Sequence, residues 1–228
     1  MPDSSPSLRD RLATARVMLI FSPQVCGARD PLAVLDAVLD HVDVVQVRPK
    51  PLATGRGDAP APAGETRDWT RRALELAARR ARPPLVIAND RVDVAMLLAH
   101  EGCAGVHLGQ DDLPPSEARE LLGPGPLIGL STHDLAQVAR ASDLALDYLG
   151  FGPVFPSATK GYARGLGAEA CWVAATAATV PLFAIGGVTR ARLAELERIE
   201  RVAVGADVLS ADDPARAARE LRELLVGE

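Results

Sequence analysis

The sequence predicts a single (β/α)8 TIM barrel with eight parallel strands, and three observations lead to this prediction. Short apolar runs rich in Val, Ile and Leu alternate with segments of helical periodicity along nearly the whole chain. Near-continuous apolar strands are typical of a parallel sheet whose outer face is covered by helices. The unit recurs eight times at about 28 residues each without a second domain, which favours closure over an open sheet.

The strands and helices follow one another in strict order. We expect strands at Val17–Ser22, Val42–Arg48, Pro84–Asn89, Gly105–Leu108, Leu127–Leu130, Tyr148–Gly152, Leu182–Ile185 and Arg201–Val204. We expect helices at Pro31–Asp40, Glu65–Ala81, Val92–His100, Pro115–Leu122, Asp134–Ala141, Glu169–Ala178, Arg192–Ile199 and Asp213–Leu225. The last helix carries the clearest start signal, an acidic cap at Asp213 followed by Pro214 in the first turn.

Two segments stand outside this alternation. Residues 1–14, which begin Ser/Pro-rich, are expected to form a flexible N-terminal segment, and residues 15–228 the barrel domain. Pro51–Glu65 is rich in Pro, Gly and Ala and has no apolar period. It is either a solvated connector or a flap, because it follows the second strand on the face where barrel enzymes carry their chemistry.

Composition and charge narrow the class of partner. The chain has 25 Lys+Arg against 30 Asp+Glu, a net charge of -5, and no basic stripe, so we expect no nucleic-acid partner. No apolar run is long enough to cross a membrane. The absence of a signal-peptide core and the wide spacing of Cys26, Cys103 and Cys171 predict a cytoplasmic protein with reduced cysteines. The sequence does not decide between a monomer and a homo-oligomer.

Polar side chains end the second strand. Because strand residues alternate between faces, Gln46, Arg48 and Lys50 share one face, while Val45 and Val47 share the face that packs under the helices. The polar set therefore points into the barrel or its mouth. An inward arginine needs an anionic partner, which is either a ligand or a carboxylate on a neighbouring strand.

Two carboxylates follow the third and fourth strands. Asp90 and Asp112 are expected at neighbouring positions on the rim, where they would repel by about 4 kcal/mol at ~4 Å with an effective dielectric of ~20. A divalent cation relieves this repulsion, and oxygen-only ligation suits Mg²⁺. The alternative is that each caps the following helix, as Asp112 before Pro114-Pro115 could do.

Further donors follow later strands. Ser157, Thr159 and Lys160 form a compact set suited to phosphate oxygens, although such a run is also typical of a surface loop. Gly186-Gly187 and Gly205-Ala206 follow the seventh and eighth strands, where many barrels bind phosphate, although a Gly-Gly pair is also a common turn. His133 is either an acid/base group or a structural histidine.

The polar strand ends occur in motifs that together resemble the thiamine-phosphate synthase family, which shares a superfamily with the thiazole tautomerases. The likeness runs from Val42 to about Leu221. The motifs are Gln46-Val47-Arg48-Pro49-Lys50, Ile87-Ala88-Asn89-Asp90, Gly105-Val106-His107-Leu108-Gly109-Gln110-Asp111-Asp112, Gly129-Leu130-Ser131, Gly150-Phe151-Gly152-Pro153-Val154-Phe155-Pro156-Ser157-Ala158-Thr159-Lys160 and Ile185-Gly186-Gly187.

The resemblance implies an activity and roles for these residues. The family joins hydroxymethylpyrimidine diphosphate to hydroxyethylthiazole phosphate. Diphosphate leaves first, giving a pyrimidine-methyl cation that the thiazole nitrogen attacks, and no protein nucleophile is required. Arg48, Lys50 and Lys160 would stabilise the leaving group, and Asp90 and Asp112 would bind Mg²⁺. The pyrimidine diphosphate would contact Gln46, Arg48, Lys50, Asn89, Ser131 and Lys160, and the thiazole phosphate Ser157, Thr159, Gly186, Gly187, Gly205 and Ala206.

The chain departs from the family pattern at several positions. The first strand ends in Ser22-Pro23 rather than an acidic or Thr-Asp type of segment, Pro49 stands for an acidic residue, and Ser157 stands for Thr. Gly205-Ala206 stands for an aliphatic-serine pair, which removes one hydroxyl from the thiazole phosphate site.

Two other functions remain open. A thiazole tautomerase-like isomerase would work by acid/base chemistry, for which His133 is available, but it needs no paired metal carboxylates. A non-catalytic barrel that binds a phosphorylated ligand would have the same fold, which by itself does not fix function.

Overall fold

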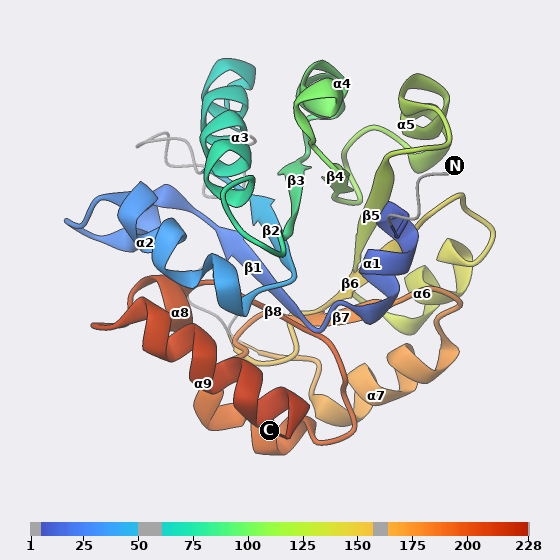
Figure 1. The fold of residues 1–228 in the computed structure, drawn as a ribbon. Coiled ribbons are helices and arrows are strands. Elements are labelled where there is room, and N and C mark those ends of the chain that lie inside the picture. Colours follow the sequence, from blue (N-terminus) through green and yellow to red (C-terminus); the bar gives the residue numbers. More distant parts are fainter. Residues whose placement is uncertain (1–5, 50–60, 157–163, 228) are drawn as a thin grey trace.

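Eight parallel strands form a closed barrel in the computed structural model, which describes residues 6–49, 61–156 and 164–227. Each strand pairs with its neighbours in the sequence and β8 pairs with β1, so the predicted fold class is confirmed (Figure 1). The strands are β1 (Val17–Phe21), β2 (Val44–Val47), β3 (Leu85–Asn89), β4 (Gly105–Leu108), β5 (Leu127–Thr132), β6 (Tyr148–Phe151), β7 (Leu182–Ile185) and β8 (Val202–Val204).

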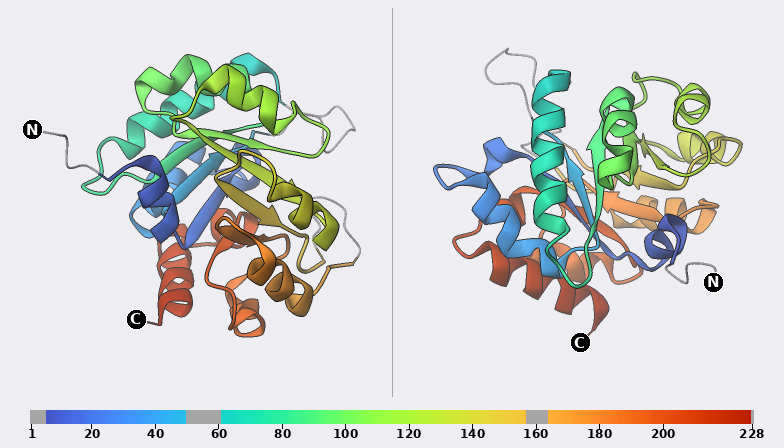
Figure 2. Two further views of the ribbon diagram at one scale, coloured as in Figure 1. Left: turned by 90° about the vertical axis from the view of Figure 1, so that its right-hand side faces the viewer. Right: turned by 45° about the horizontal axis from the view of Figure 1, so that its top comes forward.

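Helices surround the strands, as the views in Figure 2 also show. The α-helices after the first strand are α2 (Pro31–Val38), α3 (Ala63–Ala77), α4 (Val92–Leu98), α5 (Pro115–Leu122), α6 (Leu135–Ala141), α7 (Ala168–Ala177), α8 (Ala206–Leu209) and α9 (Pro214–Val226). Shorter 3-10 helices are η1 (Pro23–Cys26), η2 (Leu39–His41), η3 (Ala99–Glu101) and η5 (Arg190–Leu196). The cap expected at Asp213 is present, since its side chain accepts a hydrogen bond from the Arg216 amide.

The connection between β7 and β8 differs from the prediction. We expected an α-helix over Arg192–Ile199, but the residues form the 3-10 helix η5. A 3-10 helix rises about 2.0 Å per residue against about 1.5 Å for an α-helix, so it spans a short connection with fewer residues. The 3-10 helix begins at Arg190, five positions after β7 ends at Ile185.

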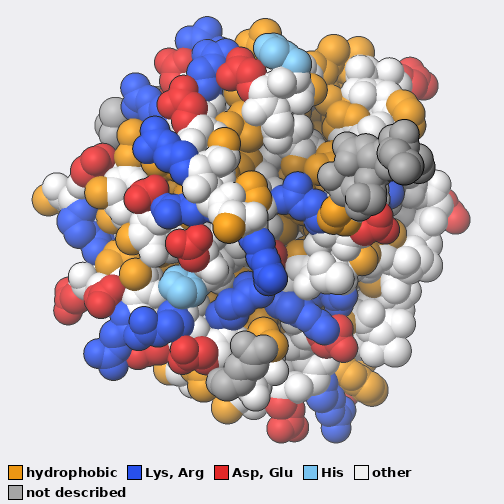
Figure 3. All heavy atoms as spheres, viewed as in Figure 1, with side chains coloured by type: hydrophobic (Ala, Val, Ile, Leu, Met, Phe, Trp, Pro, Cys, Tyr) orange, Lys and Arg blue, Asp and Glu red, His pale blue; other side chains and the backbone are white. Residues whose placement is uncertain are grey.

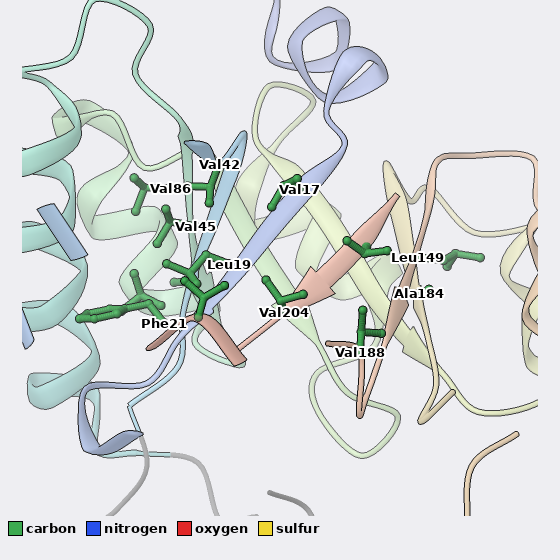
Figure 4. Packing of buried hydrophobic residues seen from close by; sticks show 14 of the residues in the cluster. Val17, Leu19, Phe21, Val42, Val45, Val86, Leu149, Ala184, Val188 and Val204 are labelled. Atoms are coloured by element: carbon green, nitrogen blue, oxygen red, sulfur yellow. The ribbon is translucent and has the colours of Figure 1, made fainter. Parts of the chain in front are cut away.

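Alternation along the strands separates two apolar clusters. The side chains of Val17, Leu19 and Phe21 in β1 point toward the helices, where they pack in the larger cluster (Figure 4). Met18 and Val44, which are partners in the β1–β2 register, belong to the smaller cluster inside the barrel. Gln46 follows Val44 on that inward face, so the expected orientation of the second strand is confirmed.

Helix α1 (Leu8–Thr14) packs against the barrel interior near the strand amino ends. Its first turn carries a capping box between Ser7 and Asp10, and Leu12 is 2% exposed within the interior cluster. Leu8 packs against the same cluster. Leu8–Thr14 thus form a helix whose apolar side packs against the barrel, within the residues 1–14 that we expected to be a flexible segment.

The surface mixes charges of both signs. Basic and acidic side chains alternate across the face seen in Figure 3, in keeping with ion pairs such as Arg16–Glu200 and Arg222–Asp43. Within the described ranges no helix is both long enough and apolar enough to span a bilayer. The three cysteines are free and buried, and burial raises the pKa of the Cys171 thiol to about 12.

We predict that Leu12→Ala lowers the free energy of unfolding by about 2–5 kcal/mol, because it removes a fully buried side chain and leaves a cavity. Urea denaturation followed by circular dichroism measures the change. Leu224→Ala is the matched control, since Leu224 is 61% exposed and its loss should change stability by less than about 0.5 kcal/mol. Equal effects of the two substitutions would show that α1 does not pack against the barrel in solution.

Candidate active site

A cavity of about 420 Å³ opens at the carboxyl ends of the strands. Residues from the end of every strand, or from the loop after it, line the cavity. This is the face where the loops of a β/α barrel gather and where such barrels carry their chemistry. The lining is mostly apolar with a few polar and charged groups, which is the usual make-up of a small-molecule site.

Most of the described residues that we selected from the sequence line this cavity. They are Gln46, Arg48, Asn89, Ser131, Gly186, Gly187, Gly205 and Ala206. Neither Asp90 nor Asp112 is part of the lining: Asp90 directly follows the lining residue Asn89, and Asp112 lies five positions after His107. Lys50, Ser157, Thr159 and Lys160 lie outside the described residues, as does most of the Pro51–Glu65 segment, of which Ala63–Glu65 belong to α3.

The end of β2 is held by β1. The Arg48 amide donates to the Phe21 carbonyl at 2.8 Å, and the Ser22 hydroxyl donates to the Arg48 carbonyl at 2.8 Å. Gln46 is 2% exposed, and its Nε2 donates to the Met18 sulfur at 3.7 Å. Backbone contacts on both sides of Arg48 therefore fix where its side chain starts at the rim of the cavity.

A chain of buried polar side chains forms the floor of the cavity. His107 of β4 is 4% exposed; its Nδ1 lies 3.0 Å from the Tyr148 hydroxyl and its Nε2 2.9 Å from the Ser131 hydroxyl. A hydrogen bond from Gln46 reaches the Tyr148 hydroxyl, while burial raises the pKa of that phenol and keeps it protonated. We call Gln46, Tyr148, His107 and Ser131 the floor relay.

The direction of the floor relay depends on the tautomer of His107. In the tautomer with the proton on Nε2, Nδ1 accepts from the Tyr148 hydroxyl and Nε2 donates to the Ser131 oxygen. In that tautomer the hydroxyl hydrogen of Ser131 can point at a ligand in the cavity, which makes Ser131 a donor.

Asp90 and Asp112 are both hydrogen-bonded to the end of β4, Asp90 through its backbone amide and Asp112 through its carboxylate. The Asp90 amide donates to the His107 carbonyl at 2.8 Å, and Oδ2 of Asp112 accepts from the Gly109 amide at 2.7 Å. Asp90 has a φ of 60°, in the left-handed region that costs most residues about 1–2 kcal/mol and that Asp and Asn tolerate best. Backbone strain of this kind is concentrated at functional sites.

Neither carboxylate caps a helix. Helix α4 begins after Arg91 and helix α5 after Pro114, and no side chain bonds the first turn at either N-cap position. The alternative that Asp112 caps the following helix is therefore wrong, because the two prolines move the helix start past its reach. Among residues 6–49, 61–156 and 164–227, no group of three or more His, Cys, Asp and Glu side chains could hold a metal.

Gly186 and Gly187 make a turn that only glycine fits. Both have positive φ, of 88° and 65°, and a Cβ on Gly187 would lie 2.7 Å from Cβ of Phe155. The Phe155 amide donates to the Gly186 carbonyl at 3.0 Å, which joins this turn to the loop after β6. The close approach leaves the backbone of this turn exposed to the cavity.

His133 lines the cavity with one ring nitrogen already engaged. Its Nδ1 donates to the Gly152 carbonyl at 2.5 Å, and its amide donates to Oε1 of Gln137 at 2.7 Å. In the neutral ring Nε2 is then a proton acceptor. The structure therefore gives His133 both a fixed orientation and a nitrogen capable of acid/base work.

Several cavity residues were not selected from the sequence: Ser22, Thr189, Arg192 and Asp207. The contact of buried Tyr148 with His107 was not predicted either. Alternation along Gly105–Leu108 would have put His107 on the inward face, because Val106 and Leu108 pack under the helices. Nothing in the sequence indicated Arg192, because its position depends on η5 being a 3-10 turn.

Comparisons of the sequence with known proteins agree on one family. A family model described as thiamine monophosphate synthase matches residues 17–210. A thiamine-phosphate synthase of Mycobacterium sp. (strain KMS) is 43% identical over 196 residues, which is 83% of this chain and 83% of that protein. A thiamine-phosphate synthase of Synechococcus sp. (strain WH7803) is 47% identical over 143 residues, which is 62% of this chain but 40% of that relative's length.

A solved structure with a related name has a similar fold. The thiamine phosphate pyrophosphorylase from Pyrococcus furiosus superposes with a TM-score of 0.78 at 26% sequence identity, and the match covers 97% of this chain and 98% of that one.

We predict that Tyr148→Phe lowers the free energy of unfolding by about 1–3 kcal/mol, because it removes the buried hydroxyl that pairs with Nδ1 of His107. Urea denaturation measures the loss. A double-mutant cycle with Ser131→Ala, which contacts the opposite nitrogen of His107, should give a coupling above about 0.5 kcal/mol. Additive effects of the two substitutions would contradict a connected relay.

Proposed function

The chain belongs to the thiamine monophosphate synthase family, and on that basis we propose that it joins hydroxymethylpyrimidine diphosphate to hydroxyethylthiazole phosphate, giving thiamine phosphate and diphosphate. One observation carries the proposal. Residues that the family resemblance assigns to two different substrates, from the ends of five strands, line a single cavity. A bimolecular reaction needs such a shared cavity, since holding both reactants together removes much of the entropic barrier.

The floor relay suits the pyrimidine half of the reaction. Gln46 and Ser131 are the ends of the relay, and both are assigned to the pyrimidine by the resemblance. A donor hydroxyl fixed from below can hold a heterocyclic nitrogen in one orientation without motion during the reaction. Asn89, the residue before Asp90, adds an amide at the same rim.

Cationic side chains suit the departure of diphosphate. Breaking the bond between the pyrimidine methylene carbon and its oxygen places both electrons, and hence negative charge, on the leaving diphosphate. Arg48 lines the cavity where that charge develops, and we assign Lys50 and Lys160 the same task from the sequence alone. The thiazole nitrogen then attacks the methylene cation with its lone pair, so no protein nucleophile takes part.

We further propose that Asp90 and Asp112 hold Mg²⁺. The donor set fits this ion in kind, because it consists of two carboxylates on residues that are both hydrogen-bonded to the end of β4. The backbone amide of Asp90 donates to the His107 carbonyl at 2.8 Å, and Oδ2 of Asp112 accepts from the Gly109 amide at 2.7 Å. Two protein carboxylates leave positions for waters and substrate phosphates, which is how Mg²⁺ is usually bound in phosphate-handling sites. When bound, the ion supplies neutralisation of charge on the leaving diphosphate.

His133 favours a second candidate, a thiazole tautomerase-like isomerase. Its Nδ1 is fixed by Gly152, which leaves Nε2 able to exchange a proton with a ligand in the cavity. Such an activity would release no diphosphate and would need neither Asp90 nor Asp112. A non-catalytic barrel would bind the phosphorylated ligands and leave both unchanged.

A cytoplasmic location belongs to the main proposal, because the three buried free cysteines suit a reducing compartment.

The experiment that tests the proposal combines the purified protein with both phosphorylated heterocycles, with and without Mg²⁺, and measures diphosphate release and thiamine phosphate formation. We expect equal amounts of the two products, with turnover that requires Mg²⁺ and falls sharply when the thiazole phosphate is omitted. Conversion of the thiazole without diphosphate release would indicate the isomerase instead. Binding of both compounds with no change in either would indicate the non-catalytic barrel.

A further inference from the structure

Arg192 faces the end of the cavity formed by the loops after β7 and β8, alongside Thr189, Gly187 and Ala206. Its guanidinium carbon lies 4.8 Å from the centre of the Phe155 ring. Within the described part of the chain, no carboxylate pairs with this guanidinium, so the ring is the contact that orients it. An arginine that lines a mostly apolar cavity and forms no ion pair with a carboxylate is suited to bind an anion.

The charges around this end of the cavity leave a positive balance. Asp207 also lines the cavity, but its Oδ2 accepts from the amide and from Nε of Arg190, at 3.1 Å and 3.0 Å. Arg190 in turn pairs with Glu220 at 2.8 Å, and Glu220 pairs with Arg216 at 2.6 Å. These four side chains neutralise one another, and the charge of Arg192 is left to face the cavity.

The sequence lacks a hydroxyl donor at the same end of the cavity, in the loop after β8. The family pattern puts a hydroxyl where this chain has Ala206, and Gly205 beside it carries no side chain. A Cβ on Gly205 would meet the Ile20 carbonyl oxygen at an ordinary 3.5 Å, so the glycine leaves open space rather than relieving a clash. The cavity is therefore wider and poorer in hydroxyl donors here than the family pattern implies.

We infer that Arg192 binds the phosphomonoester of the thiazole substrate, and that its charge takes the place of the hydroxyl absent at Ala206. The inference rests on the proposed function for the identity of the substrate, but it concerns a residue to which the family resemblance assigned no role. A planar guanidinium offers paired donors to phosphate oxygens, which makes it a stronger anion ligand than a single hydroxyl.

Phe155 ties this arginine to the glycine turn. The Phe155 side chain is 7% exposed and lies against Gly187, where any Cβ would come within 2.7 Å of its own Cβ. The ring is therefore packed against the glycine turn, and it positions the guanidinium stacked on it before the ligand binds. Preorganisation of this kind lowers the entropy cost of binding.

The test measures binding by calorimetry with three probes: hydroxyethylthiazole phosphate, the same alcohol without phosphate, and inorganic phosphate. Arg192→Ala should weaken binding of the ester and of inorganic phosphate by about 10- to 100-fold, as expected for loss of one charged hydrogen-bonding group. Binding of the alcohol should not change. Adding Ala206→Ser to this variant should recover about 2- to 10-fold.

Arg198→Ala is the matched control. Its guanidinium stacks on the Trp172 ring at 4.9 Å, so the substitution removes the same charge and the same kind of contact at a position outside the cavity lining. We expect wild-type affinity for all three probes in this variant. If Arg192→Ala does not fold, as judged by circular dichroism, Arg192→Met is used in its place, because methionine keeps an apolar side chain over Phe155 without the charge.

Equal affinity of the Arg192 and Arg198 variants for the ester would overturn the inference, and so would a wild-type protein that binds neither the ester nor phosphate. Turnover separates this inference from the proposed function. Thiamine phosphate formation with unchanged ester affinity in Arg192→Ala contradicts only the role of Arg192. Loss of ester affinity in a protein that forms no thiamine phosphate contradicts only the proposed reaction.

Discussion

The parallel register of the closed barrel is the constraint on which the site depends. Because every strand runs in the same direction, each delivers its last residues to the same mouth, and the pairing of Asn89 with His107 and of Ser131 with Gly150 sets their relative heights. Residues separated by more than a hundred positions in the chain therefore line one cavity. A slip of one residue in any strand would turn its polar side chains under the helices and its valines into the cavity.

The end of β4 connects the floor relay with the two carboxylates that are proposed to bind the metal. The His107 ring belongs to the floor relay, its carbonyl accepts the Asp90 amide, and two residues later the Gly109 amide donates to Asp112. Groups assigned to the pyrimidine ring and groups assigned to the metal thus share a short piece of backbone. A buried polar network lowers stability unless every member has a hydrogen-bond partner. A substitution that disturbs the floor relay is therefore expected to disturb the positions of Asp90 and Asp112 as well.

Features that depend on the alternation of side chains along a strand could be predicted from the sequence. Features that depend on tertiary contacts could not. Alternation placed Gln46 inward and Val45 outward, and both orientations are confirmed. It could not show that Leu8–Thr14 would pack against the barrel interior, because a short helix there gains its stability from tertiary packing. Arg192 was missed for a similar reason, since only the 3-10 turn and the Phe155 ring bring it to the cavity.

The central claim is that Asp90 and Asp112 share one cation beside the leaving diphosphate, and Mn²⁺ binding followed by electron paramagnetic resonance tests it most directly. In the presence of diphosphate, the wild type should bind one Mn²⁺, and Asp90→Asn should lose it while keeping the fold, because Asn tolerates the positive φ. Asp111→Asn, at an exposed neighbouring carboxylate, should bind like the wild type. Undiminished Mn²⁺ binding in both Asp90→Asn and Asp112→Asn would contradict the account.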